Sequence, residues 1–417
     1  MVIISEGGFL PMNSTVIITS FAMAFMSAAG TMIMPFLPLY LLELGCTEEN
    51  IGFWTAAVFS GMFLVGGLVM PLWGALSDRF GRKRMMLQSA LGFAAAFFSG
   101  GFVTAPVQLL AMRLFQGFFF GFMSIGQALI SASAGKKAGR ALGLFLSGRS
   151  AGSIMGPFMG GLLAHWFGIR WSFILAAMGA FFAFLLVAAF VKEPKGTPAA
   201  RRTGIAEKFR HLSHNKTFLL MLAMQTTNEI AVFIGMPLIA LHVGRLEGSL
   251  DDAAMISGLI MGAGGVAAMV SSPFWGWIGE KRGFARTMYL AFFGNALSAL
   301  GQFLAPDVWL FGAAQFCFGF TVIGVTVSIT GAISAATSLE ERGSAFGLSS
   351  TALSLGNFIG PVIGGALMTF IDTGAAFLAA GMVQLLAGSF IFWKYGRGSA
   401  LSPQNGRTPS AENISCK

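Results

Sequence analysis

Twelve long apolar runs constrain this chain more than any other feature. A helix that crosses a bilayer needs about 20 mostly apolar residues. Open sheets are excluded from lipid because each unpaired backbone group there is costly, and the two-residue alternation of a membrane β-barrel is absent. The runs therefore predict an all-α polytopic membrane protein with twelve transmembrane helices. The predicted spans are 15–41, 52–76, 85–104, 106–131, 141–165, 169–191, 217–242, 253–278, 286–304, 307–335, 344–370 and 374–395.

The charged residues are few and unevenly placed. Only 10% of the chain is charged, against about a quarter in ordinary globular proteins. Most of the 26 Lys and Arg lie in alternate joints between spans, so the net charge of +9 indicates membrane orientation rather than nucleic-acid binding. Because basic joints stay in the cytoplasm, we expect both termini there. We expect a monomer in the lipid bilayer of the plasma membrane, which is the inner membrane of a bacterium.

The chain repeats itself after 202 residues. This shift places PLWGALSDRFGRKR (71–84) on PFWGWIGEKRGFAR (273–286), and Met34-Pro35 on Met236-Pro237. Parallel repeats of this size predict two pseudo-symmetric six-helix bundles with a substrate path between them. The predicted parts are an N-terminal bundle, a cytoplasmic linker, a C-terminal bundle and a disordered cytoplasmic tail, at 1–191, 192–216, 217–395 and 396–417.

Three motifs point to one family. GALSDRFGRKR (74–84) resembles the signature loop of the major facilitator superfamily, and LLAMRLFQG (109–117) resembles its fourth-helix motif. GRSAGSIMGPFMGG (148–161) resembles the fifth-helix motif of the drug:proton antiporter branch, and MIMPFLPLYLLELG (32–45) is similar to bacterial multidrug-resistance members. The resemblance covers the whole chain. It implies the major facilitator fold, a small-molecule substrate and protons as the coupling ion.

The loop at 74–84 has two interpretations. It can be a cytoplasmic turn that basic residues anchor. The resemblance implies a further role as a gate, in which Asp78 pairs with a nearby cation or helix end and holds the cytoplasmic side closed. The candidate gating residues are Gly74, Asp78, Arg79, Gly81 and Arg82.

Glu229 stands apart from the other acids because it lies near the middle of a predicted span. An ionisable residue there costs at least about 2.5–3.5 kcal/mol to insert, which makes it a functional candidate. A buried carboxyl that can bind and release a proton suits a proton-coupled carrier. The alternative is a permanently protonated Glu229 that makes a structural hydrogen bond. Its polar neighbours Gln225 and Asn228 are candidates for substrate contact.

Two arginines lie inside predicted spans. Arg113 matches the fourth-helix arginine, and the resemblance implies a role in proton coupling; the alternative is that it reaches out to the membrane surface. Gln116, one turn later, is a candidate for the same cavity. Arg149 departs from the family pattern, which has a small or apolar residue there. It either reaches back to the cytoplasm or faces the cavity, where it would favour anionic, zwitterionic or neutral substrates.

The apolar side chains offer candidates for the cavity wall. The chain holds 43 Phe and 24 Met, and most of them must face lipid or fill the bundle cores. An adaptable apolar wall suits promiscuous binding. The candidate substrate contacts of this kind are Phe36, Phe115, Phe119 and Met224.

Glycine recurs every fourth residue in the fifth span, and the corresponding span of the second half repeats the ending as GNFIGPVIGG (356–365). Small residues at this spacing let helix backbones approach closely. The two spans either pack tightly or form sliding surfaces between the bundles. The candidate helix-packing residues are Gly152, Gly156, Pro157, Gly160, Gly360, Pro361 and Gly364.

These patterns favour transport. No phosphate-binding GKS or GKT loop, Ser/His/Asp arrangement or metal-ligand spacing is present, so we expect no enzyme, cofactor or metal. The main hypothesis is a secondary active transporter that exports amphiphilic, drug-like molecules by proton antiport with alternating access. The alternatives are a dedicated exporter of one endogenous metabolite, such as a metallophore or siderophore, and a sugar or nutrient transporter.

Overall fold

The computed structural model describes residues 14–134, 138–192, 212, 214–250, 252–337 and 342–396, and every regular element in these ranges is a helix. The first half holds α1 (Ser14–Met32), η1 (Met34–Phe36), α2 (Leu37–Glu43), α3 (Ile51–Phe80), α4 (Arg82–Gly100), α5 (Pro106–Phe118), α6 (Phe122–Ala134), α7 (Ala138–Phe167) and α8 (Ile169–Phe190). The second half holds α10 (Lys216–Gly235), η3 (Met236–Leu238), α11 (Ile239–Glu247), α12 (Ala253–Arg282), α13 (Phe284–Leu304), α14 (Val308–Ala336), α15 (Arg342–Phe370) and α16 (Thr373–Tyr395). Most of the predicted linker 192–216 and tail 396–417 lies outside the described residues.

Every predicted span coincides with a helix or a pair of helices, so the all-α fold class is confirmed. Nine helical stretches in the described ranges are long and apolar enough to cross a membrane. The other three spans are α4, α7 and α13, which contain more polar and small residues.

Three of the predicted spans, the first, the fourth and the seventh, are interrupted rather than continuous helices. The first and seventh spans narrow to 3-10 turns at η1 and η3, because Pro35 and Pro237 each lack the N–H that a helix needs. The fourth span breaks between α5 and α6 without a proline. There the side chains of Trp73 and Ser89 donate to the freed carbonyls of Phe118 and Phe119, at 2.6 Å each.

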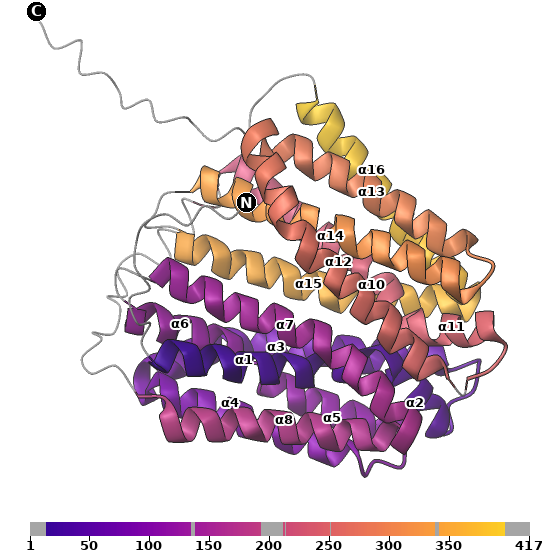
Figure 1. Ribbon diagram of the computed structural model, residues 1–417, viewed down its shortest axis with the longest axis horizontal. Coiled ribbons are helices and arrows are strands. Elements are labelled where there is room, and N and C mark those ends of the chain that lie inside the picture. The colour runs from indigo at the N-terminus through magenta and orange to yellow at the C-terminus, as the bar shows by residue number, and fades with distance from the viewer. Residues whose placement is uncertain are drawn as a thin grey trace, which may run out of the picture.

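The two halves form two helix bundles that lie side by side, indigo to magenta for the first and orange to yellow for the second (Figure 1). Within the first bundle α1 packs along α7, and within the second α10 packs along α15. The bundles meet through α3 against α15 and α7 against α12.

The repeat seen in the sequence reappears in the contacts. The indole N–H of Trp73 donates to the Phe118 carbonyl at 2.6 Å, and that of Trp275 donates to the Phe320 carbonyl at 2.7 Å. The turns between α3 and α4 and between α12 and α13 both need a positive φ, of 95° at Gly81 and 88° at Gly283, which favours glycine. The two pseudo-symmetric bundles are therefore confirmed.

Within the described part of the chain, the bundles make close contacts at one end. We call the end with the Gly81 and Gly283 turns the basic end and the other the opposite end. Toward the opposite end a Cβ at Gly161 would stand 3.1 Å from the Gly258 Cα. There too, His165 Nδ1 lies 3.0 Å from Asp252 Oδ1, joining α7 to α12. These contacts join α7 to α12 at the opposite end.

The glycine ladders pack inside each bundle. Cβ atoms at Gly148, Gly152, Gly156 and Gly160 would collide with the α1 backbone at Ser20, Ala24, Ala28 and Met32. Those at Gly356, Gly360 and Gly364 would collide with α10. The hypothesis that the ladders are sliding surfaces between the bundles is therefore wrong, because these glycines face a helix of their own bundle. The Pro157 carbonyl, next to the ladder, does face Gly258 of the other bundle.

We predict that Gly152→Ala destabilises the protein by about 1–3 kcal/mol, since the new methyl group would overlap backbone atoms of Ala24 and Ala28, which have little room to move. The measurement is thermal unfolding of the purified protein in detergent. Gly143→Ala on the same helix is the control, because open space surrounds that position. Equal melting of the two variants would contradict the prediction.

Candidate functional site

A cavity of about 280 Å³ lies between the two bundles. Its lining comes from α1, η1, α3, α4, the turn between α5 and α6, α6 and α7 of the first bundle and from α10, η3 and α15 of the second. A ligand there would touch both bundles at once, as the substrate path predicted between them requires.

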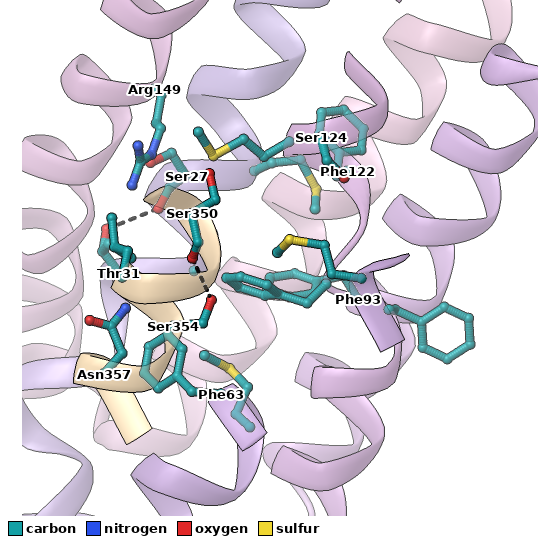
Figure 2. A pocket seen from close by; sticks show the side chains of 18 of the residues that line it. Ser27, Thr31, Phe63, Phe93, Phe122, Ser124, Arg149, Ser350, Ser354 and Asn357 are labelled. Carbon is teal, nitrogen blue, oxygen red and sulfur yellow. Dashed lines mark hydrogen bonds between the residues drawn. The ribbon is translucent and has the colours of Figure 1, made fainter. Parts of the chain in front are cut away.

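One side of the cavity is apolar, and many of its side chains can change conformation easily. Phenyl rings and thioethers cover it, and Figure 2 shows Phe93 and Phe122 on that side. Unbranched Met side chains adapt to ligands of different shapes. The lining residues of this kind are Met23, Met26, Met34, Met62, Phe63, Met70, Phe93, Phe119, Phe120, Phe122, Met123, Phe233 and Met236.

Most of the polar side chains gather on the facing side, where Figure 2 shows Ser27, Thr31, Arg149, Ser350, Ser354 and Asn357, with Phe63 next to them, while Ser124 lies beside Phe122. The hydroxyl of Thr31 donates to the Ser27 carbonyl at 2.9 Å, and that of Ser354 donates to the Ser350 carbonyl at 3.0 Å. Their donors are thus bound to their own helices, and their oxygens are left to accept. The cavity therefore has an apolar half and a polar half, which suits an amphiphile.

Arg149 lines the cavity, which decides between the two interpretations of this residue. Among the described residues that form the lining, it is the one charged side chain. Its guanidinium interacts electrostatically with the carboxylate of Glu229 on α10, in the other bundle. The sequence could not show this, because the direction of a side chain depends on how the helix is rotated in its bundle.

Glu229 lies beside the cavity, and amide groups surround its carboxylate. Oε1 accepts from Gln225 Nε2 at 3.0 Å and from Asn228 Nδ2 at 3.4 Å. With its nitrogen turned toward Glu229, Asn357 donates to Oε2 at 3.2 Å and to the Leu353 carbonyl at 3.1 Å. Hydrogen bonds to a carboxylate favour its charged form, whereas burial opposes it. The predicted trio of Glu229, Gln225 and Asn228 is brought together, and Asn357 completes it.

Further amides extend this network into the second bundle. Gln384 Nε2 donates to Asn228 Oδ1 at 3.5 Å, and Asn295 Nδ2 donates to Gln384 Oε1 at 3.4 Å. The hydroxyl of Thr321 donates to Asn295 Oδ1 at 2.6 Å. The chain of side chains fixes which way the Asn228 amide faces.

Sequence reasoning missed Asn357, Gln384 and Asn295. Each is an amide inside an apolar span, with at most 5% of its surface exposed. Glu229 is conspicuous as an ionisable residue inside an apolar span. An Asn or Gln inside an apolar span is a similar signal in the sequence, and it marks these three residues.

Arg113 is enclosed in the first bundle, with 3% of its surface exposed. Nη1 donates to Gln116 Oε1 at 2.6 Å, and Nε donates to the Val58 carbonyl at 3.3 Å. Arg113 therefore does not reach the membrane surface, and neither it nor Gln116 belongs to the described cavity lining. Arg113 Nη2, Gln116 Nε2 and the hydroxyl of Thr55 are buried without a partner in the described part of the chain.

Of the four apolar candidates, Phe119 lines the cavity, and the other three lie away from its lining. Phe36 is completely buried in the core at η1, and Met224 packs into the core of the second bundle. Phe115 is 47% exposed on the outer face of α5. Their role as substrate contacts stays a prediction, which this cavity does not support; in so apolar a chain, aromatic and Met side chains occupy every kind of environment.

The candidate gating residues lie at the basic end. Arg82 Nη1 donates to the Ala128 carbonyl of α6 at 2.9 Å, and Arg79 lies over the Phe80 ring. The surroundings of Gly74 and the side chain of Asp78 fall outside the described part. The gating role of these residues stays a prediction.

We predict that Gln116→Leu destabilises the protein by about 1–3 kcal/mol, because it leaves a buried guanidinium donor without its acceptor. The double variant Arg113→Met/Gln116→Leu removes both partners, and we expect it to regain most of that stability. Thermal unfolding in detergent measures both. A double variant that melts no higher than Gln116→Leu would argue against the buried pair.

Known proteins of similar sequence and shape identify the family. The profile of the Major Facilitator Superfamily matches residues 19–305 and 255–414. The chain is 33% identical to "Multidrug resistance protein MdtG" of Proteus mirabilis (strain HI4320), over 82% of this chain and 86% of that protein. It is 31% identical to "Multi-drug resistance efflux pump PmrA homolog" of Lactococcus lactis subsp. lactis (strain IL1403), over 89% and 91%.

Among solved structures, a bacterial homolog to human lysosomal transporter Spinster superposes with a TM-score of 0.76 at 14% identity, over 93% of this chain and 96% of that one. This likeness concerns the fold. Together with the profile and the sequence relatives, it places the chain among multi-pass membrane transporters rather than enzymes. The chain belongs to the major facilitator superfamily.

Proposed function

We propose that this protein exports amphiphilic small molecules, drug-like compounds among them, in exchange for protons by alternating access. The observation that carries the proposal is the two-sided cavity between the bundles, with a buried carboxyl beside it. Two relatives that are named for multidrug resistance support the substrate class.

The wall of the cavity supports export of more than one compound. Thioethers and phenyl rings can repack around different apolar bodies, while Arg149 and the hydroxyl oxygens meet the polar part of the ligand. A positive charge in the lining favours neutral, zwitterionic or anionic amphiphiles over simple cations.

Glu229 is the proposed proton carrier. Its carboxylate lies between amide donors and behind the cavity, where both the charged and the neutral form can be held. Arg113, with its partner Gln116, is the second proposed member of the coupling machinery. A carboxyl is needed because an arginine stays protonated in proteins.

The proposed orientation places the basic end and both termini in the cytoplasm of a plasma-membrane protein, in accord with the positive-inside rule. The opposite end, where contacts join α7 to α12 in this structure, then faces outward. Export requires these contacts to open and the bundles to rock against each other.

We predict that uphill export of N-phenyl-1-naphthylamine, a neutral fluorescent amphiphile, stops when a protonophore removes the proton gradient. Glu229→Gln should reduce uphill export by about tenfold, a usual size for coupling between two sites. The measurement is dye release from energised cells that express each variant. Glu280→Gln is the control, because Glu280 is exposed at the basic end. Export that survives the protonophore in the wild type would refute proton antiport.

We also predict that a covalent bridge between α7 and α12 at the opposite end arrests transport. His165→Cys and Asp252→Cys, in a chain without its own cysteines, are bridged with a short bis-methanethiosulfonate reagent, and a reductant should restore transport. The matched control is Arg245→Cys with Asp372→Cys, since this ion pair lies within one bundle. Undiminished transport after complete bridging would contradict opening at this end.

A further inference from the structure

The side chain of Asn357 stands between Glu229 and the cavity. It belongs to α15, lines the cavity, and has 5% of its surface exposed. Figure 2 shows the two ends of its amide pointing in different directions, one toward the cavity beside Thr31 and the other away from it. The end away from the cavity meets Glu229 Oε2 and the Leu353 carbonyl. One amide thus touches both the proposed proton site and the substrate space.

The two oxygens of Glu229 differ in their partners. Oε1 accepts from both Gln225 and Asn228, whereas Oε2 accepts from Asn357 alone among the described residues. A proton on Oε1 would displace two donors, and a proton on Oε2 would meet only one. Protonation of Glu229 therefore takes place on the oxygen that faces Asn357.

The orientation of the Asn357 amide depends on this proton. An ionised carboxylate only accepts, so the amide nitrogen must face Oε2 and the amide oxygen faces the cavity. A protonated Oε2 is a donor, and an N–H that faces it loses its acceptor. A half-turn of the amide then brings its oxygen to the O–H. The terminal torsion of Asn has two broad minima, and the two ends have nearly the same size, so the turn needs almost no extra space.

The Leu353 carbonyl disfavours the turned orientation, because the amide oxygen would then lie beside another acceptor, so the O–H of a protonated Glu229 must outweigh this contact. This carbonyl lies one helical turn before Asn357 on α15, where a backbone N–H supplies its regular helix bond. It keeps that bond when the amide nitrogen turns away. The charged group that interacts with Glu229 from another helix is Arg149 on α7, and its guanidinium is charged in both states. Among the described groups around Glu229, the Asn357 amide is thus the one in the cavity wall whose orientation must change when Glu229 gains or loses its proton.

We propose that Asn357 is the positioning residue that transmits the proton on Glu229 to the cavity, by turning either its carbonyl or its NH₂ group toward the substrate. The proposal deepens the proposed function and rests on it. An ionised Glu229 leaves a hydrogen-bond acceptor in the cavity wall, and a protonated Glu229 leaves a donor there. An amphiphile that offers an N–H or O–H at this point binds to the unprotonated protein and is rejected by the protonated one.

The direction of this coupling is that of an antiporter. Substrate and proton oppose each other, because the protonated state places a donor against a donor. By reciprocity, the bound substrate must also weaken proton binding by the same factor. The selected substrates are amphiphiles with a hydrogen-bond donor beside their apolar body.

The test compares two probes that differ by one group. N-phenyl-1-naphthylamine has an N–H, and N-methyl-N-phenyl-1-naphthylamine replaces it by a methyl group; both stay uncharged between pH 5.5 and 8.5. Equilibrium binding of each radiolabelled probe is measured on purified protein in nanodiscs at both pH values. No gradient is present, so binding is read independently of transport.

For the wild type, we expect the N–H probe to bind about five- to tenfold more tightly at pH 8.5 than at pH 5.5, the size of one lost hydrogen bond. The N-methyl probe should bind equally at both. Asn357→Leu and Asn357→Ala should both remove the pH effect for the N–H probe, although Glu229 is intact. Thr351→Ala is the control on α15, because Thr351 is exposed and lies outside the described cavity lining, and this variant should keep the full pH effect.

The outcomes separate this proposal from the proposed function. If the pH effect is present in the wild type, absent in Glu229→Gln and still complete in both Asn357 variants, Glu229 is the proton site and the role of Asn357 is refuted. An equal pH effect for both probes would also refute it. If neither probe binds the wild type, or if binding does not depend on pH, the proposed function fails together with the inference.

Discussion

Close contact between helix backbones is the interaction on which the rest of this structure depends. In lipid, apolar side chains gain little by leaving their surroundings, so helices associate mainly where small residues let backbones pack. The ladder of α7 against α1 and that of α15 against α10 provide such contact, one in each bundle. The same helices carry the chemistry: α7 holds Arg149, α10 holds Glu229 and α15 holds Asn357. Gly356 even packs directly on the Cβ of Glu229. The ladders therefore fix where the polar groups stand.

Hydrogen bonding among side chains solves a second problem in the same medium. A polar group inside an apolar bundle needs a partner, since water is absent. The second bundle meets this need with a chain of amides from Asn228 through Gln384 to Asn295, which ends at the Thr321 hydroxyl. The first bundle encloses Arg113 with one amide and one carbonyl. Each bundle thus has its own polar interior, and the pseudo-symmetry of the backbone does not extend to these groups.

The sequence predicted the helices and the repeat because both depend on composition and spacing. It also predicted Glu229, since a lone acid in an apolar span is conspicuous. It could not predict the direction of Arg149, because the rotation of a helix about its axis is decided by packing with other segments. It missed the break between α5 and α6, where no proline marks the place and side chains distant in sequence supply the hydrogen bonds. Asn357 is recognisable in the sequence as an amide inside an apolar span, but its place beside Glu229 depends on how α15 packs against α10.

The opposite charges beside the cavity belong to different bundles. Arg149 is carried by α7 and Glu229 by α10, and they interact without a direct ion pair in the described structure. Coulomb energy depends on separation, and rocking of one bundle against the other changes the separation of these two groups. The relative energies of the two transport states must then differ between a charged and a neutral Glu229. In the proposed antiport, a proton on Glu229 therefore changes the balance between the arrangements of the two bundles as well as the local hydrogen bonds, through an attraction between groups of different bundles.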